Sequence, residues 1–212
     1  IRTYVRFLWH DGSMTSAAQR ILGIDPGLTR CGFGIIDVAP NRQLTLVTVG
    51  VLRTPADAPP EQRLRTIADG VQELMDQYTP GVLAIERVFA QHNRSTVMGI
   101  AQLSGALLVQ AARQDLAVAM HTPSEVKAAV SGYGAADKQQ VAAMVARLLR
   151  LPEPPKPADA ADALALAITH AWRGGASAAA GAAHLPHHDT PALRAWRAAA
   201  QAASSRRSRL GA

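Results

Sequence analysis

Runs of apolar residues, separated by turn-forming residues, divide the first half of the chain into strands and one helix. Three β-rich runs follow one another, with Pro26-Gly27 and Pro40-Asn41 between them. This arrangement predicts three successive antiparallel strands. They occupy residues 20–25, 31–38 and 43–53. Apolar residues at helical spacing predict a helix over 60–78, and an apolar run of strand length follows at 82–88.

The second half of the chain is mostly helical in pattern. Residues 94–114 predict a long helix, in which Gly99 and Gly105 suit close packing between helices, and 116–121 predict a strand. The run from Thr122 to Glu125 has the pattern of a capping box, with proline at the first helical position, so a short helix follows to about residue 130. The remaining segments are a loop at 131–134, a helix at 136–150, a proline-rich linker at 151–157 and a last helix at 158–172.

The order of these elements predicts the fold class. Strands separated by single helices imply parallel neighbours joined by crossovers, whereas the first three strands imply a meander. We therefore expect an α/β domain with a five-stranded mixed sheet flanked by helices, over residues 20–173. We interpret residues 1–19 as a tag and leader, because Gly-Ser precedes Met14 and the residues before it look unrelated to the rest. Residues 174–212 are predicted to be a flexible, Ala-rich basic tail.

Charge is unevenly distributed over the 212 residues. Residues 174–212 contain five Arg and one Asp, a net charge of +4 out of the total of +6. Two interpretations of this tail remain open: a solubilising disordered segment, or a loose arm that binds phosphate groups.

Composition excludes several classes of protein. The single cysteine, Cys31, rules out an intrachain disulfide and a thiolate zinc site. No apolar run approaches the roughly 18 residues of a membrane span, and we find no apolar core of a signal peptide near the start. We therefore expect a cytoplasmic protein without membrane contact.

Four acidic residues lie where the predicted fold would bring them together. Asp25 ends the first strand and Glu86 ends the fourth, so if these strands are adjacent and parallel, both carboxylates leave the same edge of the sheet. Ligands of α/β sheets bind at that edge. Asp159 and Asp162 are three residues apart in the first turn of the last helix, so they share one helix face.

Converging carboxylates favour a hard divalent cation. Mg²⁺ and Mn²⁺ prefer oxygen ligands, and two such ions about 4 Å apart can clamp the attacking and leaving oxygens of a phosphodiester. Each acid also has an ordinary explanation, as a turn residue, a helix cap or a solvated strand end. From the pattern alone, a metal site and a set of unrelated surface acids remain alternatives.

The motifs themselves carry a family resemblance. The segments ILGIDPGLTRCGFGIID, LAIERVF, PSEVKAAVSGYGAADKQQV and PADAADALALAITH resemble, in order and spacing, the RuvC family of Holliday-junction resolvases. The similarity covers residues 20–173. It implies a ribonuclease H-like fold and a homodimeric, Mg²⁺- or Mn²⁺-dependent endonuclease with one or two ions in each active site. Such an enzyme makes paired nicks in four-way DNA junctions during recombination and repair. The nicks leave 5′-phosphate ends, and a branch-migration motor acts alongside in the bacterial cytoplasm.

The resemblance also assigns roles to residues. It implies that Asp25, Glu86, Asp159 and Asp162 are the catalytic, metal-binding carboxylates. Phe89 matches an aromatic residue that stacks on unpaired junction bases, although a core phenylalanine is the ordinary alternative. Basic residues are candidate contacts to DNA, with solvated surface side chains as their alternative: Lys127, Lys138, Arg87 and Arg94. His170 falls near the Asp159 face of the last helix and is better explained as a packed or surface histidine than as a ligand.

Three other functions are alternatives to junction resolution. Sugar kinases and actin-like ATPases begin with a similar strand and Asp turn, but they need a second domain and a second phosphate motif. A ribonuclease H-like nuclease acting on RNA would keep the same acids, and Phe89 with the 131–134 loop favours the junction instead. A junction-binding module without activity would be expected to lack at least one acid. The helix at 94–114 is our candidate dimer interface.

Overall fold

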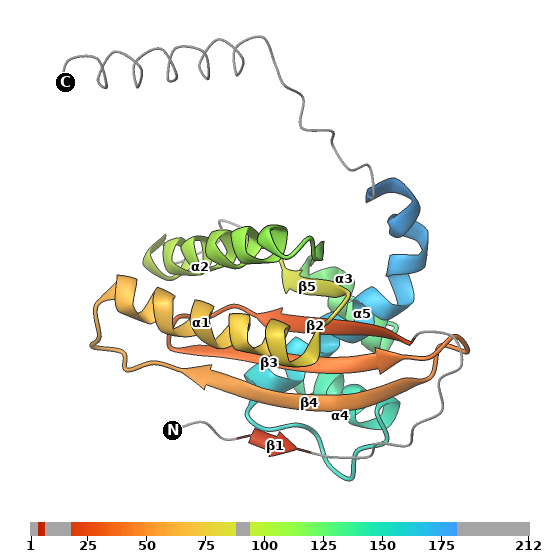
Figure 1. The fold of residues 1–212 in the computed structure, drawn as a ribbon. Helices are drawn as coiled ribbons and strands as arrows, with labels where there is room; N and C mark the ends of the chain where they lie inside the picture. Colours follow the sequence, from red (N-terminus) through yellow and green to blue (C-terminus); the bar gives the residue numbers. More distant parts are fainter. Residues whose placement is uncertain (1–3, 7–17, 88–93, 182–212) are drawn as a thin grey trace, which may run out of the picture. The chain divides into compact units, whose positions relative to one another are not determined.

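The computed structural model describes residues 4–6, 18–87 and 94–181. Within these residues, six strands form one sheet in the order β1-β4-β3-β2-β5-β6 (Figure 1). The strands are β1 (Tyr4–Arg6), β2 (Gln19–Asp25), β3 (Arg30–Val38), β4 (Leu44–Arg53), β5 (Val82–Glu86) and β6 (Ala117–His121). The helices are α1 (Pro60–Tyr78), α2 (Arg94–Arg113), α3 (Pro123–Ser131), α4 (Lys138–Leu148) and α5 (Ala158–Gly181).

The five predicted strands pair as expected. Strands β2, β3 and β4 form an antiparallel meander, while β5 lies parallel to β2 and β6 lies parallel to β5. This confirms the α/β class with a mixed sheet. The sheet belongs to the first of two compact units, Ile1–Ala176. None of the helices in the described ranges is long and apolar enough to cross a membrane.

Two elements differ from the prediction. A sixth strand, β1, comes from the segment interpreted as a leader and pairs antiparallel with β4, whose outer edge offers unpaired backbone groups. Helix α5 ends at Gly181 rather than at residue 172. The two glycines after Arg173 suggested an end, but the alanines beyond them are strong helix formers. The rest of the predicted tail, 182–212, lies outside the described residues.

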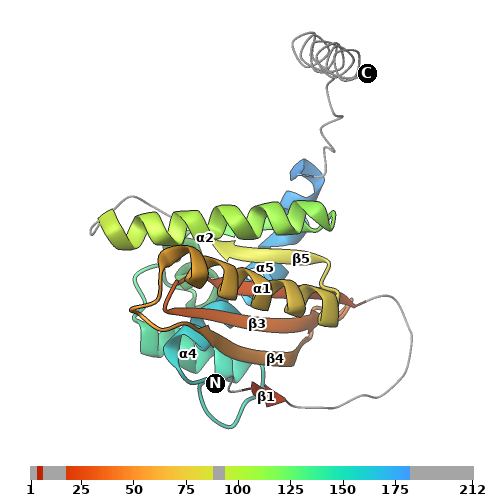
Figure 2. The same ribbon diagram turned by 60° about the vertical axis from the view of Figure 1, so that its left-hand side comes forward.

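Helices cover both faces of the sheet (Figures 1 and 2). On one face, α1 and α2 pack over a core that contains Phe33, Ile67 and Leu107, all at most 1% exposed. On the other face, α3, α4 and α5 pack over Ile21, Ile36 and Val145. The central strands are therefore buried on both sides.

Helix α5 approaches the sheet unusually closely, because the strands place glycines at the contact. A Cβ atom on Gly23 would lie 2.1 Å from the carbonyl oxygen of Ala163, and one on Gly34 would lie 2.6 Å from the side chain of Leu164. Gly23 and Gly34 are partners across β2 and β3. The helix therefore lies almost directly on the backbone of these two strands.

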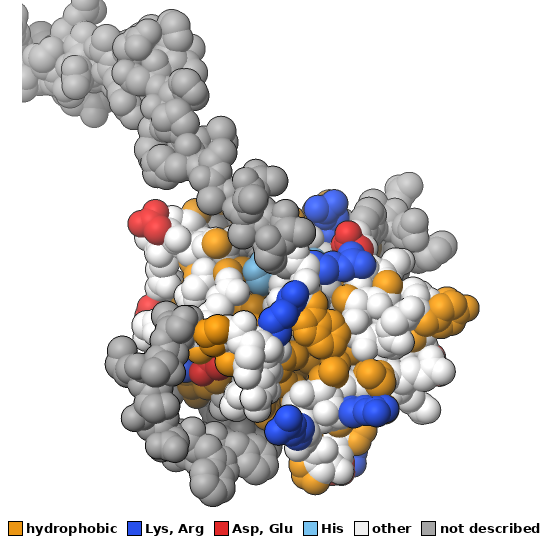
Figure 3. Space-filling model, turned by 90° about the vertical axis from the view of Figure 1, so that its right-hand side faces the viewer, with side chains coloured by type: hydrophobic (Ala, Val, Ile, Leu, Met, Phe, Trp, Pro, Cys, Tyr) orange, Lys and Arg blue, Asp and Glu red, His pale blue; other side chains and the backbone are white. Residues whose placement is uncertain are grey.

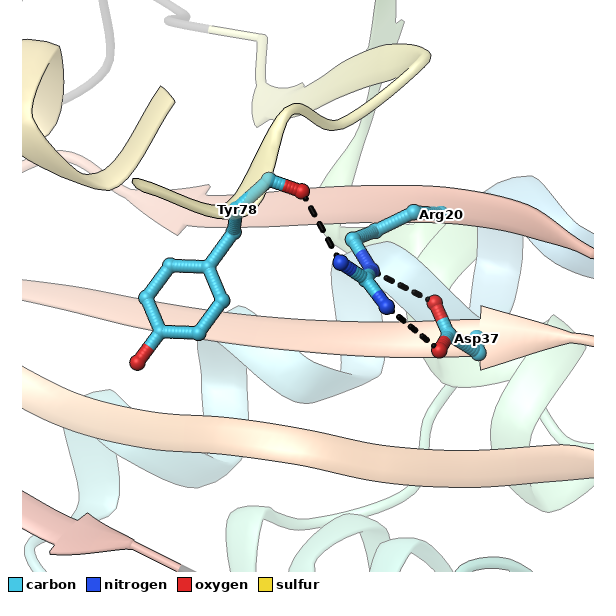
Figure 4. Close-up of polar contacts among 3 residues, drawn as sticks. All are labelled: Arg20, Asp37 and Tyr78. Atoms are coloured by element: carbon cyan, nitrogen blue, oxygen red, sulfur yellow. Dashed lines mark hydrogen bonds and ion pairs between the residues drawn. The ribbon is translucent and has the colours of Figure 1, made fainter. Parts of the chain in front are cut away.

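An ion pair fixes the end of the sheet where β2 begins (Figure 4). Arg20 donates from Nε and Nη2 to the two carboxylate oxygens of Asp37, at 2.7 and 2.8 Å, and from Nη1 to the carbonyl oxygen of Tyr78 at 3.0 Å. These contacts join β2, β3 and the end of α1. The side of the molecule in Figure 3, toward which β3 runs, carries scattered basic side chains among apolar ones. The acidic side chains visible there are dispersed, and Asp25 lies at the other end of β2.

Candidate active site

Two neighbouring strands deliver the first two carboxylates. Asp25 is the last residue of β2 and Glu86 is the last residue of β5. The preceding residues, Ile24 and Ile85, are partners in the parallel pair, and both are fully buried. The core therefore anchors both strands up to the residue before each acid, and the acids leave the sheet side by side, as predicted.

The first turn of α5 delivers the other two carboxylates. Asp159 and Asp162 lie one turn apart on this helix. Gly32 on β3 is the partner of Asp25, and a Cβ atom on Gly32 would lie only 2.0 Å from the carbonyl oxygen of Asp159. The missing side chain at position 32 thus brings the start of α5 to the side of Asp25.

Substitution of Gly32 with alanine is expected to impair both the folding stability and any reaction at this carboxylate cluster. The new methyl group collides with backbone, so α5 must move; overpacking of this kind costs about 1–3 kcal/mol of folding free energy. A displacement of about 1 Å in catalytic groups can cost roughly 10²-fold in rate. Reaction rates and denaturant midpoints measure the two effects. Gly81→Ala is the control, since its Cβ would be 3.7 Å from the nearest atom; equal behaviour of the two variants would contradict the prediction.

Burial and mutual repulsion raise the pKa values of Asp25 and Glu86. Burial raises the pKa of Asp25 to about 7, and repulsion from Glu86, Asp162 and Asp159 adds to this, while Lys138 opposes it. Burial and Asp162 also raise the pKa of Glu86. The four carboxylates therefore act on one another as one electrostatic cluster, and this cluster resists taking up its full negative charge without a cation.

Two basic side chains already partner this cluster. Lys138 Nζ donates to Asp162 Oδ2 at 2.7 Å, a contact that raises the pKa of Lys138. Lys138 is the first residue of α4, and Asp137 with Gln140 forms a reciprocal capping box that fixes the helix start. Arg30 Nε lies 3.1 Å from Asp159 Oδ2. The motif containing Arg30 was recognised in the sequence, but this pairing depends on the long-range approach of α5 and has no local signal.

The donor set fits a hard divalent cation by charge and by chemistry. Four carboxylates carry four negative charges when ionised, and Lys138 and Arg30 supply two positive charges. Two negative charges remain, and oxygen donors are those that Mg²⁺ and Mn²⁺ prefer. In the described part of the chain no three His, Cys, Asp or Glu side chains are already grouped to hold a metal ion. The two basic side chains engage carboxylate oxygens that a metal would need.

Four further residues are predicted to bind DNA. Phe89 lies outside the described residues. Arg87 follows Glu86 directly and is exposed, and Arg94 is the first residue of α2. Lys127 is half-buried on α3, and within the described ranges it forms no ion pair with the acids. Among the predicted DNA-binding residues whose side chains the structure describes, only Lys138 contacts a carboxylate.

His170 packs against another histidine instead of joining the acids. Its ring centroid lies 5.7 Å from that of His121 at the end of β6. Burial lowers the pKa of both histidines, that of His121 to about 4. This agrees with the interpretation of His170 as a packed histidine.

The fold and the site define a class. A meander followed by parallel strands, with acids at two adjacent strand ends and on a helix packed across them, is the arrangement of the ribonuclease H-like nucleases. The carboxylate cluster lies at the edge of the sheet where α/β proteins bind their ligands.

Comparison with known proteins identifies the family. The family model for crossover junction endodeoxyribonuclease RuvC matches residues 21–170. A crossover junction endodeoxyribonuclease RuvC from Leifsonia xyli subsp. xyli is 60% identical over 189 residues, which cover 85% of this chain and 91% of the relative. The Thermus thermophilus RuvC structure is 33% identical, with a TM-score of 0.69, and the match covers 75% of this chain and 97% of that one. T. thermophilus RuvC in complex with Holliday junction substrate is 34% identical with a TM-score of 0.70, over 74% and 94% of the two chains. The chain belongs to the RuvC family of crossover junction endodeoxyribonucleases, which are divalent-metal-dependent hydrolases.

Proposed function

We propose that this protein resolves four-way (Holliday) DNA junctions in recombination and DNA repair. It hydrolyses one phosphodiester in each of two opposing strands and leaves 5′-phosphate ends. The observation that carries the proposal is the convergence of Asp25, Glu86, Asp159 and Asp162 from two strand ends and one helix. The resemblance to T. thermophilus RuvC, which was solved with a Holliday junction substrate, supports the choice of DNA.

The same four carboxylates would hold one or two Mg²⁺ or Mn²⁺ ions. When bound, such an ion supplies a nucleophilic water of lowered pKa and neutralises charge on the phosphate. Lys138 already places its ammonium among the acids, so it can stabilise negative charge on the leaving 3′ oxygen. Arg87, Arg94 and Lys127 contact backbone phosphates, and Phe89 stacks on an unpaired base.

The protein would act as a homodimer, because two sites related by a two-fold axis match the symmetry of a four-way junction. One side of α2 is suited to the interface. Met98 and Val109 on this helix are 60% and 52% exposed. Between them, Gly105 has no other atom within 4 Å of where its Cβ would lie. Small and apolar residues on an exposed helix face allow a second helix to pack closely.

Substitution of Gly105 with arginine is therefore expected to prevent dimerisation without unfolding the protein. The new side chain enters open space in its own chain, but it would be buried in a helix–helix contact. In sedimentation velocity, the sedimentation coefficient should fall from that of a dimer to that of a monomer. Ala143→Arg, on the exposed side of α4, is the control. An unchanged sedimentation coefficient for Gly105→Arg would exclude this face as the interface.

A cleavage assay tests the proposed function as a whole. A labelled immobile four-way junction is incubated beside linear duplex and an RNA–DNA hybrid, with Mg²⁺, Mn²⁺ or EDTA. Symmetric nicking of the junction alone, dependent on metal, supports the proposal. Cutting of the hybrid or duplex instead would overturn the choice of substrate, and tight junction binding without cutting would favour a binding module.

The enzyme acts in the bacterial cytoplasm, where a branch-migration motor complex brings junctions to it. Addition of such a motor to the cleavage assay should increase the rate of resolution of mobile junctions, while an immobile junction is cut at an unchanged rate.

A further inference from the structure

Two arginines face each other beside the carboxylate cluster. Arg30 at the start of β3 and Arg53 at the end of β4 are direct partners in the antiparallel ladder. Side chains of such partners project from the same face of the sheet, and like charges placed directly opposite destabilise the pair. The sheet therefore brings two positive charges together where neutral residues would be more stable.

Within the described ranges only one acidic partner relieves this repulsion. Arg30 pairs with Asp159 through Nε, and its side chain remains 56% exposed. Arg53 is exposed and forms no ion pair with any residue that the structure describes. The pair thus keeps one unneutralised guanidinium, that of Arg53, directly across the ladder from Arg30, whose side chain contacts Asp159.

The backbone around the two arginines is held firmly. Thr29 precedes Arg30 and Thr54 follows Arg53, at the end of the pair away from the turn that joins β3 to β4. Thr54 N donates to the carbonyl oxygen of Thr29 at 3.2 Å. Arg63 on α1 donates from Nη2 to Thr29 Oγ1 at 2.6 Å and from Nε to Thr54 Oγ1 at 3.2 Å. Arg30 and Arg53 are therefore presented by fixed strand ends, so little backbone entropy is lost when a ligand binds.

Arg53 also borders an open groove. A cavity of about 390 Å³ lies between β4 and the proline-rich segment, and Val49, Val51 and Arg53 line its sheet side. On the opposite wall, Lys156 Nζ is paired with Glu153 Oε2 at 3.1 Å. Of the three charged side chains that line the groove, Arg53 alone lacks a described partner, so an anion that enters beside the active site meets this guanidinium.

We propose that Arg30 and Arg53 together bind a backbone phosphate of the DNA strand next to the phosphate that is cut. The inference rests on the proposed function and adds a contact to it. Guanidinium groups present paired donors that match phosphate oxygens, and a phosphate between the two arginines removes their repulsion. Because Arg30 also contacts Asp159, the same phosphate positions the strand relative to the catalytic carboxylates.

The salt dependence of junction binding tests this contact. Junction affinity is measured in EDTA for the wild type, Arg53→Gln and Arg53→Lys. Each lost phosphate contact lowers the slope of log affinity against log salt by about 0.9. Arg53→Gln should therefore lower the slope by about 0.9 per bound protomer. For each bound protomer, the loss of junction affinity between about 50 and 200 mM salt should then be roughly 3.5-fold smaller than in the wild type. Arg53→Lys should retain the wild-type slope, because it keeps the charge.

Arg147→Gln is the matched control, because Arg147 is exposed near the end of α4, far along that helix from Lys138. A wild-type slope for Arg53→Gln, or the same loss in Arg147→Gln, would overturn the inference. Either result leaves the proposed function intact if the wild type still binds and cuts the junction. A wild-type protein that does not bind the junction overturns the proposed function and this contact with it.

Discussion

Replacement of Glu86 with glutamine is expected to slow junction cleavage on the order of 10²–10³-fold, the scale of losing one group that stabilises charge in a transition state. Glutamine has the same shape, and Ile85 before it is fully buried, so the end of β5 should stay in place. The change removes one of four charges that would hold the metal. Single-turnover cleavage rates measure the loss, and a mobility-shift assay measures junction affinity.

Binding should survive in this variant or become tighter, because one negative charge near the DNA phosphates is removed. Glu61→Gln is the control, since Glu61 is exposed in the first turn of α1 and its loss should change neither quantity. If junction affinity fell as much as the cleavage rate, Glu86 would have a role in substrate binding or folding rather than in the chemistry.

The positions of the acids could be predicted because they depend on local geometry and on strand order. Asp25 and Glu86 each end a predicted strand. Their convergence required these strands to be adjacent and parallel, a condition that the pairing of Ile24 with Ile85 meets. Asp159 and Asp162 share a face because any helix places residues three apart on one side. Strand alternation and helix period are local rules, so a sequence can reveal them.

The partners of the acids could not be predicted, because they depend on how far α5 lies from the sheet. That distance is set by Gly32 and Gly34 on β3, which face the backbone of Asp159 and the side chain of Leu164. The contact between Arg30 and Asp159 exists only as a result of this approach. Strand β1 was missed for a related reason, since its pairing depends on the open edge of β4 and on no periodic pattern of its own.

Burial of Asp25 and its repulsion by the neighbouring acids cost folding stability. Replacement of Asp25 with asparagine should abolish cleavage and yet stabilise the metal-free protein. The pKa of Asp25 in the folded protein is about 7, above its ordinary value of 3.8. The ionised form is therefore less favourable in the folded state than in the unfolded state. This penalty is absent below about pH 4, grows between about pH 4 and 7, and is complete above that range.

Asparagine cannot ionise, so the variant should gain about 2–4 kcal/mol of unfolding free energy at about pH 8 in EDTA. The gain should disappear near pH 4, and denaturant unfolding at both pH values measures it. Asp69→Asn on the exposed side of α1 should show no such pH-dependent gain. If Asp25→Asn gave the same gain at both pH values, or lost stability at the higher pH, the cost of ionising Asp25 in its buried, acidic surroundings would not be the cause.

Metal binding should shrink or reverse the difference in stability between the wild type and Asp25→Asn. An ion that binds only the folded state adds about 2.7 kcal/mol at a free concentration 100 times its Kd, and Asp25→Asn would lack one of the proposed ligands. Saturating Mg²⁺ or Mn²⁺ should therefore stabilise the wild type much more than the variant, so that the difference seen in EDTA shrinks or changes sign. Equal stabilisation of both proteins by metal would mean that Asp25 is not a ligand. The carboxylates that destabilise the empty site are thus expected to be the ones that hold the cation.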